Sequence, residues 1–428
     1  MRNHTKARAL AVISALAVVG LTAACSANGG SSGGSSHKLE ITSWWTSGSE
    51  EAALNVLIAA DKKADPGVNI DNAAVSGGGG ANAQQALAAR LAANDPPATW
   101  QLHPDAQLRN YVAAGQVADI TDLWTKNGWA KDLPASVAKV QQVDGKYYTV
   151  PVGVHRGNVM WTNLKVLSAA GVTIDPKGSF DDLIADLKKV QATGVTPVCL
   201  GDKDIFASSE LLEAIMMQTL GSDKYQQLIA GDYSFDSPEV REAVGYYKTF
   251  LSLANTDHTS LTWDQASANL AAGKCAINVM GDWAYGELVN DKAVPATDFG
   301  WQQLPGSEDI FDYVGDGFSI PAKNNPATAA SKVWLETLMD PKVQTDFAAK
   351  KGSIPALTTA DTSSLSEYQQ GSAKSFKSGS VVSSLAQGQA TPAEFTQTYA
   401  DAVTALNGDG NVDEFVATLK AAQASQLK

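Results

Sequence analysis

The alternation of strand-like and helix-like segments over residues 39–102 constrains the fold more than any other feature of this sequence. Extended segments are expected at 39–45, 68–75 and 99–102, with helices at 50–64 and 82–93 between them. Apolar residues recur at helical spacing in the first of these helices. A strand–helix–strand–helix–strand order predicts a parallel sheet with helices on both faces, and therefore an α/β fold.

Aromatic, glycine-rich and polar residues follow the ends of these three strands. They are Trp44 and Trp45, then Gly77–Gly80, and then Gln101 and His103. Ligands bind at the carboxyl ends of parallel strands, so these segments are expected to line one site. Side chains on a strand alternate between faces, so only one of the two tryptophans can point into a packed face. We expect Trp45 near the site and leave a purely structural place in the core open for Trp44.

The first 37 residues have the pattern of a targeting segment and a tether. A basic region at 2–8 precedes an apolar run at 9–21 that is too short to span a bilayer. Small residues then lead into Cys25, which resembles a bacterial lipoprotein cleavage box, although the usual leucine lies one position too early. We predict a signal peptide at 1–24, a lipidated Cys25 and a flexible Gly/Ser-rich tether to residue 37. An ordinary secretion signal is the alternative.

Two further cysteines, Cys199 and Cys275, each lie in a short apolar segment that is expected to form a strand. Outside the cell an even pair of cysteines favours a disulfide. Two buried free thiols remain the alternative.

The remainder of the chain predicts a second α/β unit. A hairpin is expected about Asp144-Gly145, followed by a crossover near Gly153 and Gly157. Later strands are expected at 196–200, 275–280, 299–304 and 317–320, and a helix at 206–220. A length of 428 residues also suits two lobes or two domains better than one small domain.

Composition excludes several classes of function. The formal net charge is −13 and Lys and Arg form no cluster, which argues against nucleic acid as a partner. No two of the five histidines lie three to five residues apart, so no local metal site is expected. Gly77–Gly80 is followed by Ala81 and does not continue as a phosphate-binding loop. We predict no cofactor and a monomeric protein.

Three carboxylates, Glu50, Asp282 and Asp316, are expected at strand ends and could form a glycosidase acid and base pair. Each also has a simpler structural explanation. Glu50 can be the capping-box partner of Ser47, Asp282 can cap the helix that begins at Trp283, and Asp316 can occupy a turn between two glycines.

Tryptophans accompany these carboxylates, and this mixture is typical of sugar sites. Trp44, Trp45, Trp263 and Trp283 all fall at strand ends or helix starts. An indole stacks on the apolar face of a pyranose ring, while carboxylate, amide, imidazole and ammonium groups bind its hydroxyls.

Several segments together resemble one family. They are Leu39–Glu50, Asn94–His103, Pro151–Trp161, Ala276–Trp283, Asp316–Pro321 and Lys350–Pro355. In the same order, they resemble the extracellular solute-binding lipoproteins of bacterial carbohydrate ABC importers, and most closely the glucose/mannose-binding proteins.

The resemblance implies a two-lobed periplasmic-binding-protein-like α/β fold with hinge strands and a ligand cleft between the lobes. It places residues 38–152 and about 312–372 in an N-terminal lobe, and residues 153–311 and about 373–428 in a C-terminal lobe. It also implies non-catalytic sugar capture, for a monosaccharide such as glucose or mannose. The sugar would be delivered to the membrane subunits of an importer at the outer face of the cytoplasmic membrane, where Cys25 anchors the chain.

The sugar-binding residues implied by the resemblance come from the matched segments. They are Glu50, Gln101, His103, Asp316 and Lys351 as hydroxyl partners, Trp263, Trp283 and Trp45 as stacking surfaces, and Asp282 and His155 as second-rank candidates. Gln387 occupies a position where the glucose-type pattern has histidine, which leaves the identity of the sugar open. A secreted glycoside hydrolase and an adhesion or signalling lipoprotein that uses the same cleft as a sensor are the alternatives.

Overall fold

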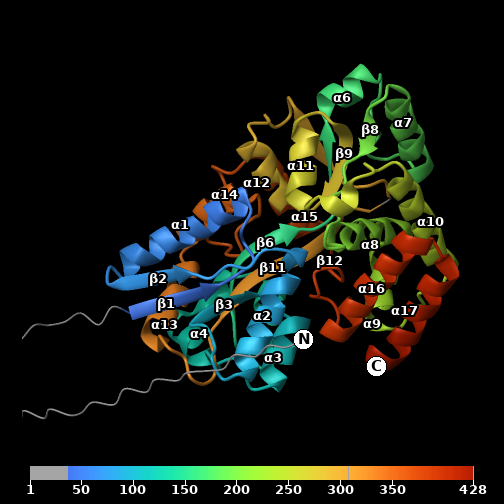
Figure 1. Ribbon diagram of the computed structural model, residues 1–428. Helices are drawn as coiled ribbons and strands as arrows, with labels where there is room; N and C mark the ends of the chain where they lie inside the picture. Colours follow the sequence, from blue (N-terminus) through green and yellow to red (C-terminus); the bar gives the residue numbers. More distant parts are fainter. Residues whose placement is uncertain (1–36, 307, 428) are drawn as a thin grey trace, which may run out of the picture. The chain divides into compact units, whose positions relative to one another are not determined.

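A computed structural model describes residues 37–306 and 308–427. The predicted signal peptide, Cys25 and nearly all of the tether lie outside these residues. Within them, two separate β-sheets are seen (Figure 1). Each sheet packs against a hydrophobic core of its own.

The first sheet has six strands in the order β12-β11-β3-β1-β2, with β6 paired to β11. Its strands are β1 His37–Thr42, β2 Val68–Asn72, β3 Thr99–Leu102, β6 Val150–Arg156, β11 Ile310–Ser319 and β12 Ser380–Ser383. The strand β1 pairs in parallel with both β2 and β3, as the alternation in the sequence predicts. The long strand β11 runs antiparallel to β3 and β6.

Helices from two distant parts of the chain pack with this sheet. They are α1 Gly48–Ala64, α2 Ala81–Ala92, α3 Ala106–Ala113, α4 Thr121–Asn127, α5 Ala135–Val140, α13 Thr328–Leu338 and α14 Pro341–Lys351. In the core, Phe318 of β11 lies between Trp45 and Trp334, at ring-centroid distances of 5.7 and 5.4 Å. A hydrogen bond from Lys351 to Glu50 joins the C-terminal end of α14 to the start of α1.

The second sheet has four strands in the order β10-β7-β9-β8. They are β7 Val159–Asn163, β8 Thr196–Val198, β9 Cys275–Met280 and β10 Phe299–Gln302. Its core includes residues of α6 Leu164–Ala169, α7 Phe180–Ala192, α8 Phe206–Leu220, α9 Ser222–Ala230, α10 Pro238–Ser252, α11 Trp263–Ala271, α12 Trp283–Asn290, α15 Glu367–Ser378, α16 Ala393–Asp409 and α17 Val412–Gln426.

The chain passes between the two cores more than once. Buried residues of the first core come from 39–154 and 311–357, and those of the second from 159–310 and 368–422. The strands β6 and β11 lie at these crossings and pair with each other. The predicted lobe boundaries near 152, 312 and 372 remain predictions.

Several predicted elements coincide with the structure. The helix at 206–220 and the strands at 99–102 and 275–280 have the predicted bounds. The hairpin about Asp144-Gly145 joins β4 Gln142–Val143 to β5 Lys146–Tyr147, and both turn residues have the positive φ angles, 50° and 77°, that a two-residue turn of this kind requires.

Three structural explanations for the carboxylates are wrong. Ser47 makes no side-chain capping bond at the start of α1, and the Glu50 carboxylate binds Lys351 instead. Asp282 precedes α12 without capping it. Asp316 is not in a turn, because β11 begins at Ile310 and is therefore longer than predicted.

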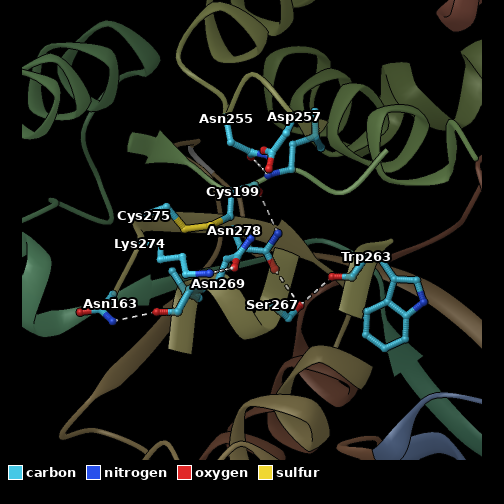
Figure 2. Close-up of a disulfide and its surroundings, with 12 residues drawn as sticks. Asn163, Cys199, Asn255, Asp257, Trp263, Ser267, Asn269, Lys274, Cys275 and Asn278 are labelled. Atoms are coloured by element: carbon cyan, nitrogen blue, oxygen red, sulfur yellow. Dashed lines mark hydrogen bonds between the residues drawn. A yellow bond between two sulfur atoms is a disulfide. The ribbon is translucent and has the colours of Figure 1, made fainter. Parts of the chain in front are cut away.

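Cys199 and Cys275 form a disulfide that ties the end of β8 to the start of β9, with the two Cα atoms 5.7 Å apart (Figure 2). The Asn278 side chain donates to the carbonyl of Cys199, and the Ser267 hydroxyl lies 3.1 Å from the Asn278 amide oxygen. The same hydroxyl lies 3.2 Å from the carbonyl of Trp263. The disulfide is therefore linked to the start of α11, which carries Trp263.

None of the helices in the described part of the chain combines the length and the apolar character needed to cross a membrane.

Candidate functional site

A cavity of about 470 Å³ lies where the ends of several strands meet residues of the second core. Trp44, Trp45 and Glu50 follow β1, and Gly77, Gly79 and Gly80 follow β2. Residues from β6 and β11 form part of the wall, and Trp263 and Trp283, at the starts of α11 and α12, form another part. The cavity therefore contains groups from both cores.

The glycine loop is needed for close packing at this cavity. Gly79 and Gly80 have φ angles of 55° and 104°, which glycine adopts readily. A Cβ atom at Gly80 would lie 2.9 Å from the Trp44 ring, and one at Gly79 would lie 2.6 Å from the Phe206 ring. Glycine therefore lets this loop approach both the indole of Trp44 and a ring of the second core.

In the cavity wall, Asp316 lies between a buried amide and a buried imidazole. Gln101 donates its Nε2 to Oδ1 at 2.8 Å, and His155 Nε2 lies 2.9 Å from Oδ2. Burial alone raises the pKa of Asp316, but the hydrogen bond and the charge of His155 outweigh burial and hold the pKa below its usual value. Asp316 is therefore a charged acceptor.

His155 lies between two carboxylates. Its Nδ1 is 2.6 Å from Oδ1 of Asp282, and its Nε2 contacts Asp316. Burial lowers the pKa of His155, but the charges and hydrogen bonds of Asp282 and Asp316 outweigh burial and raise the pKa to about 9.

A buried ion pair lies beside this group. Lys351 Nζ is 2.6 Å from Oε1 of Glu50, and both side chains are less than 10% exposed. The same ammonium lies 5.8 Å from the ring centroid of Trp45 and 5.5 Å from that of Trp283. Burial raises the pKa of Glu50, and Lys351 offsets part of that rise.

His103 adds a neutral imidazole. Burial lowers its pKa, and the charge of Asp316 offsets only part of that effect. Its Nδ1 lies 2.9 Å from the carbonyl oxygen of Gly315 and donates to it, which leaves Nε2 as the acceptor.

Most of the predicted sugar-binding residues line the cavity. These are Trp45, Glu50, His103, His155, Trp263, Trp283, Asp316, Lys351 and Gln387. Gln101 and Asp282 do not line it. Each is buried behind the wall and binds a residue that does: Gln101 binds Asp316, and Asp282 binds His155.

Sequence reasoning missed other residues of the cavity wall. They include Thr46, Ser76, Asn82, Lys203, Asp204, Phe206, Thr262 and Asp264. Trp44 is the more exposed of the two adjacent tryptophans, and Trp45 packs between Phe318 and Phe347. Asp264 could have been found as the neighbour of Trp263, whereas no local pattern marks the segment at 203–206.

In residues 37–306 and 308–427, no three His, Cys, Asp or Glu side chains are placed to hold a metal ion. Lys351 is paired with Glu50, and the single cation His155 is shared by Asp316 and Asp282. Each of the two buried acids in the cavity wall, Glu50 and Asp316, therefore has a cation of the protein beside it.

Comparison with known proteins places this architecture in a family. Residues 45–345 match the bacterial extracellular solute-binding proteins. The chain belongs to this family. An uncharacterized ABC transporter extracellular-binding protein of Pyrococcus horikoshii is 32% identical over 379 residues, which cover 88% of this chain and 85% of the relative.

A second relative, named as a probable sugar-binding periplasmic protein of Mesorhizobium japonicum, is 32% identical over 373 residues, or 86% of this chain and 88% of the relative. Among solved structures, a chitin oligosaccharide binding protein superposes with a TM-score of 0.80 at 19% identity, and the match covers 91% of this chain and 98% of that one. The predicted two-lobed α/β fold is thereby confirmed.

Proposed function

We propose that this solute-binding protein captures a neutral sugar, a monosaccharide such as glucose or mannose, and delivers it to an ABC-type importer. The observation that carries the proposal is the composition of one cavity. Indole rings from both cores, Trp44 and Trp45 on one side and Trp263 and Trp283 on the other, share it with two charge-compensated polar pairs.

A pyranose suits this combination because it has apolar C–H faces and a ring of hydroxyl groups. The indoles offer surfaces for the faces. Asp316 and Glu50 offer carboxylate oxygens for the hydroxyls, and hydrogen bonds to charged groups are the stronger ones. Since Lys351 and His155 already compensate these acids, an uncharged ligand fits better than an anionic one.

The size of the cavity supports a small ligand. Its volume of about 470 Å³ lies in the lower half of the range usual for small-molecule sites, roughly 300–1,000 Å³. We therefore favour a monosaccharide over a longer oligosaccharide.

The relatives support the transport function. The Mesorhizobium relative is named for sugar binding and the Pyrococcus relative for an ABC transporter. A ligand that contacts groups from both cores stabilises their closed arrangement, and the importer would recognise that arrangement. Lipid on Cys25 would keep the protein at the outer face of the membrane, where a tether raises its local concentration near the importer.

One observation favours a glycosidase as the second candidate: the pKa of Glu50 is raised and the pKa of Asp316 is lowered, as in an acid and nucleophile pair. Against it, Lys351 holds Glu50 as an acceptor, and the third candidate acid, Asp282, does not reach the cavity. We therefore propose binding without catalysis.

Tryptophan fluorescence titrated with a panel of sugars tests the proposal. We expect a saturable change with glucose or mannose that Trp263→Ala reduces, while the control Trp129→Phe, which lies in the first core away from the cavity, leaves it intact. No response to any mono- or disaccharide would contradict sugar binding, and turnover of aryl glycosides would favour the hydrolase.

A further inference from the structure

Asp282 is a completely buried acid at the junction of the two sheets. It lies between the end of β9 and the start of α12. Its main-chain N–H donates to the carbonyl of Arg156, and its Oδ2 accepts from the N–H of Arg156 at 3.0 Å. Its Oδ1 contacts Nδ1 of His155. Asp282 is therefore bonded to two consecutive residues of the crossing strand β6.

The arrangement of His155 favours two ring protons. An ionised carboxylate only accepts hydrogen bonds. Nδ1 is hydrogen-bonded to Asp282 at 2.6 Å, and Nε2 lies 2.9 Å from Oδ2 of Asp316 in an ion-pair contact without hydrogen-bond alignment. A proton on each nitrogen makes both contacts attractive. A neutral imidazole has a single N–H and would direct a lone pair at one of the two carboxylates.

We propose that Asp282 is a positioning residue for ligand binding, which holds His155 in its doubly protonated form so that His155 in turn orients the Asp316 carboxylate toward the cavity. This inference rests on the proposed function, because sugar binding supplies the ligand that Asp316 would contact. Asp282 itself does not reach the cavity.

Titratable groups from neighbouring elements also lie near Asp282, His155 and Asp316. Lys351 at the end of α14, paired with Glu50 of α1, is a charged group near Asp316, and the neutral imidazole of His103 follows β3. Glu210 of α8 faces Asp282, and burial raises its pKa well above the usual value.

The guanidinium of Arg156, the neighbour of His155 on β6, is directed at Asp309 and Ser375 and away from Asp282. The cation that lies between Asp282 and Asp316 is therefore His155. The pKa of His155, raised to about 9, is consistent with this arrangement.

Asp282→Asn is the sharpest change because it keeps the volume and the oxygen that accepts from the N–H of Arg156. The amide nitrogen would then face Nδ1 of His155 and donate to it. His155 would become neutral, with its single proton on Nε2, and Asp316 would lose a full positive charge while its contact with Nε2 remains.

Two readouts test the proposal on the full chain. In selectively ¹⁵N-histidine-labelled protein, with His155 assigned from a His155→Gln spectrum, we expect the imidazolium to persist through neutral pH and to titrate near pH 9. In Asp282→Asn we expect a neutral imidazole at pH 7.5. Calorimetry at that pH should show sugar affinity lower by about tenfold or more, as expected for weakening a charged hydrogen bond.

Asp291→Asn is the matched control, because this exposed acid at the other end of α12 does not line the cavity. It should leave the affinity and the His155 signals unchanged. If His155 of the unmodified protein titrates near its ordinary pKa of about 6.5, the proposal is wrong even if the variant does not fold.

An Asp282→Asn protein that folds and keeps both the imidazolium and the affinity would also refute the proposal. If the unmodified protein binds no sugar at all, the proposed function fails, and the histidine spectra still decide the protonation of His155.

Discussion

Asp312 and Asp316 lie four residues apart on β11, on the same face of one strand and equally buried, yet their surroundings differ completely. Asp316 receives Gln101 and His155. Asp312 has no hydrogen-bond partner for either carboxylate oxygen among the described residues. The nearby Arg156 is occupied by Asp309 and other acceptors, so it compensates Asp312 only in part.

The consequence is an opposite pKa shift in two like residues. Burial, followed by the charges of Glu213 and Glu210, raises the pKa of Asp312 well above its usual value. For Asp316, His155 reverses the effect of burial and lowers the pKa. In these two aspartates, the presence of a cation beside the carboxylate decides the direction of the pKa shift, so Asp316 and not Asp312 is suited to accept hydrogen bonds from a ligand.

The largest expected effect is a difference in sugar affinity between variants of these two aspartates. Asp316→Asn removes the charged acceptor and leaves His155 facing an amide, so we expect sugar affinity to fall about a hundredfold or more. Asp312→Asn, the matched control on the same strand, should change affinity by less than about threefold, because Asp312 does not line the cavity. Isothermal titration calorimetry measures both, and equal losses in the two variants would break the comparison.

A smaller effect is expected when Glu50 loses its cation and becomes, like Asp312, a buried acid without a paired charge. Lys351→Met leaves Glu50 buried without its cation, so its pKa should rise further and the carboxyl should become neutral. We expect sugar affinity to fall about tenfold or more, with a loss of up to about 3 kcal/mol in the free energy of unfolding.

The double variant Glu50→Gln/Lys351→Met provides the control for this effect, measured by urea unfolding and calorimetry. It should recover most of the stability, because no unpaired charge remains, without recovering the affinity. Recovery of affinity would show that neither charge is used for the ligand.

The smallest expected effect is a pH dependence of stability with opposite signs for the two aspartates. Because the pKa of Asp312 is raised on folding, its contribution is full below pH 3.8 and is lost as pH rises toward its folded pKa. Because the pKa of Asp316 is lowered, its contribution is full above pH 3.8 and is lost as pH falls below that value.

Comparing the unmodified protein with Asp312→Asn in the window between about pH 5 and 6.5 isolates the Asp312 effect, because other acids whose pKa values are raised, such as Asp61, Glu210 and Glu213, are present in both proteins. In urea unfolding over this window, Asp312→Asn should lose less stability with rising pH than the unmodified protein, by up to about 1.4 kcal/mol per pH unit. Identical slopes would mean that Asp312 is ionised in the folded protein.

The fold could largely be predicted from local patterns, because strand and helix periodicity and turn residues lie close together in sequence. The hairpin at Asp144-Gly145 and the helix at 206–220 are examples. The position of β11 was harder to predict, because its residues are buried on both faces and show no clear alternation.

The site could be predicted only in part, since its residues meet through the fold. Glu50 and Asp316 follow from a resemblance along the sequence, but the pairing of Glu50 with Lys351 joins residues 301 positions apart. No local pattern reveals that Asp282 lies behind His155, or that Trp44 and not Trp45 is the more exposed indole. Capping and turn rules gave wrong explanations for Glu50, Asp282 and Asp316, because the carboxylate oxygens of these residues contact partners that lie far away in the sequence.

A crystal structure of the protein with the sugar that gives the strongest saturable response tests the central claim most directly. We predict that the ring lies against Trp263 or Trp283, and that at least one hydroxyl donates to the Asp316 carboxylate while His155 stays bonded to it. A sugar bound outside this cavity, or inside it without contact to Asp316, would contradict the account.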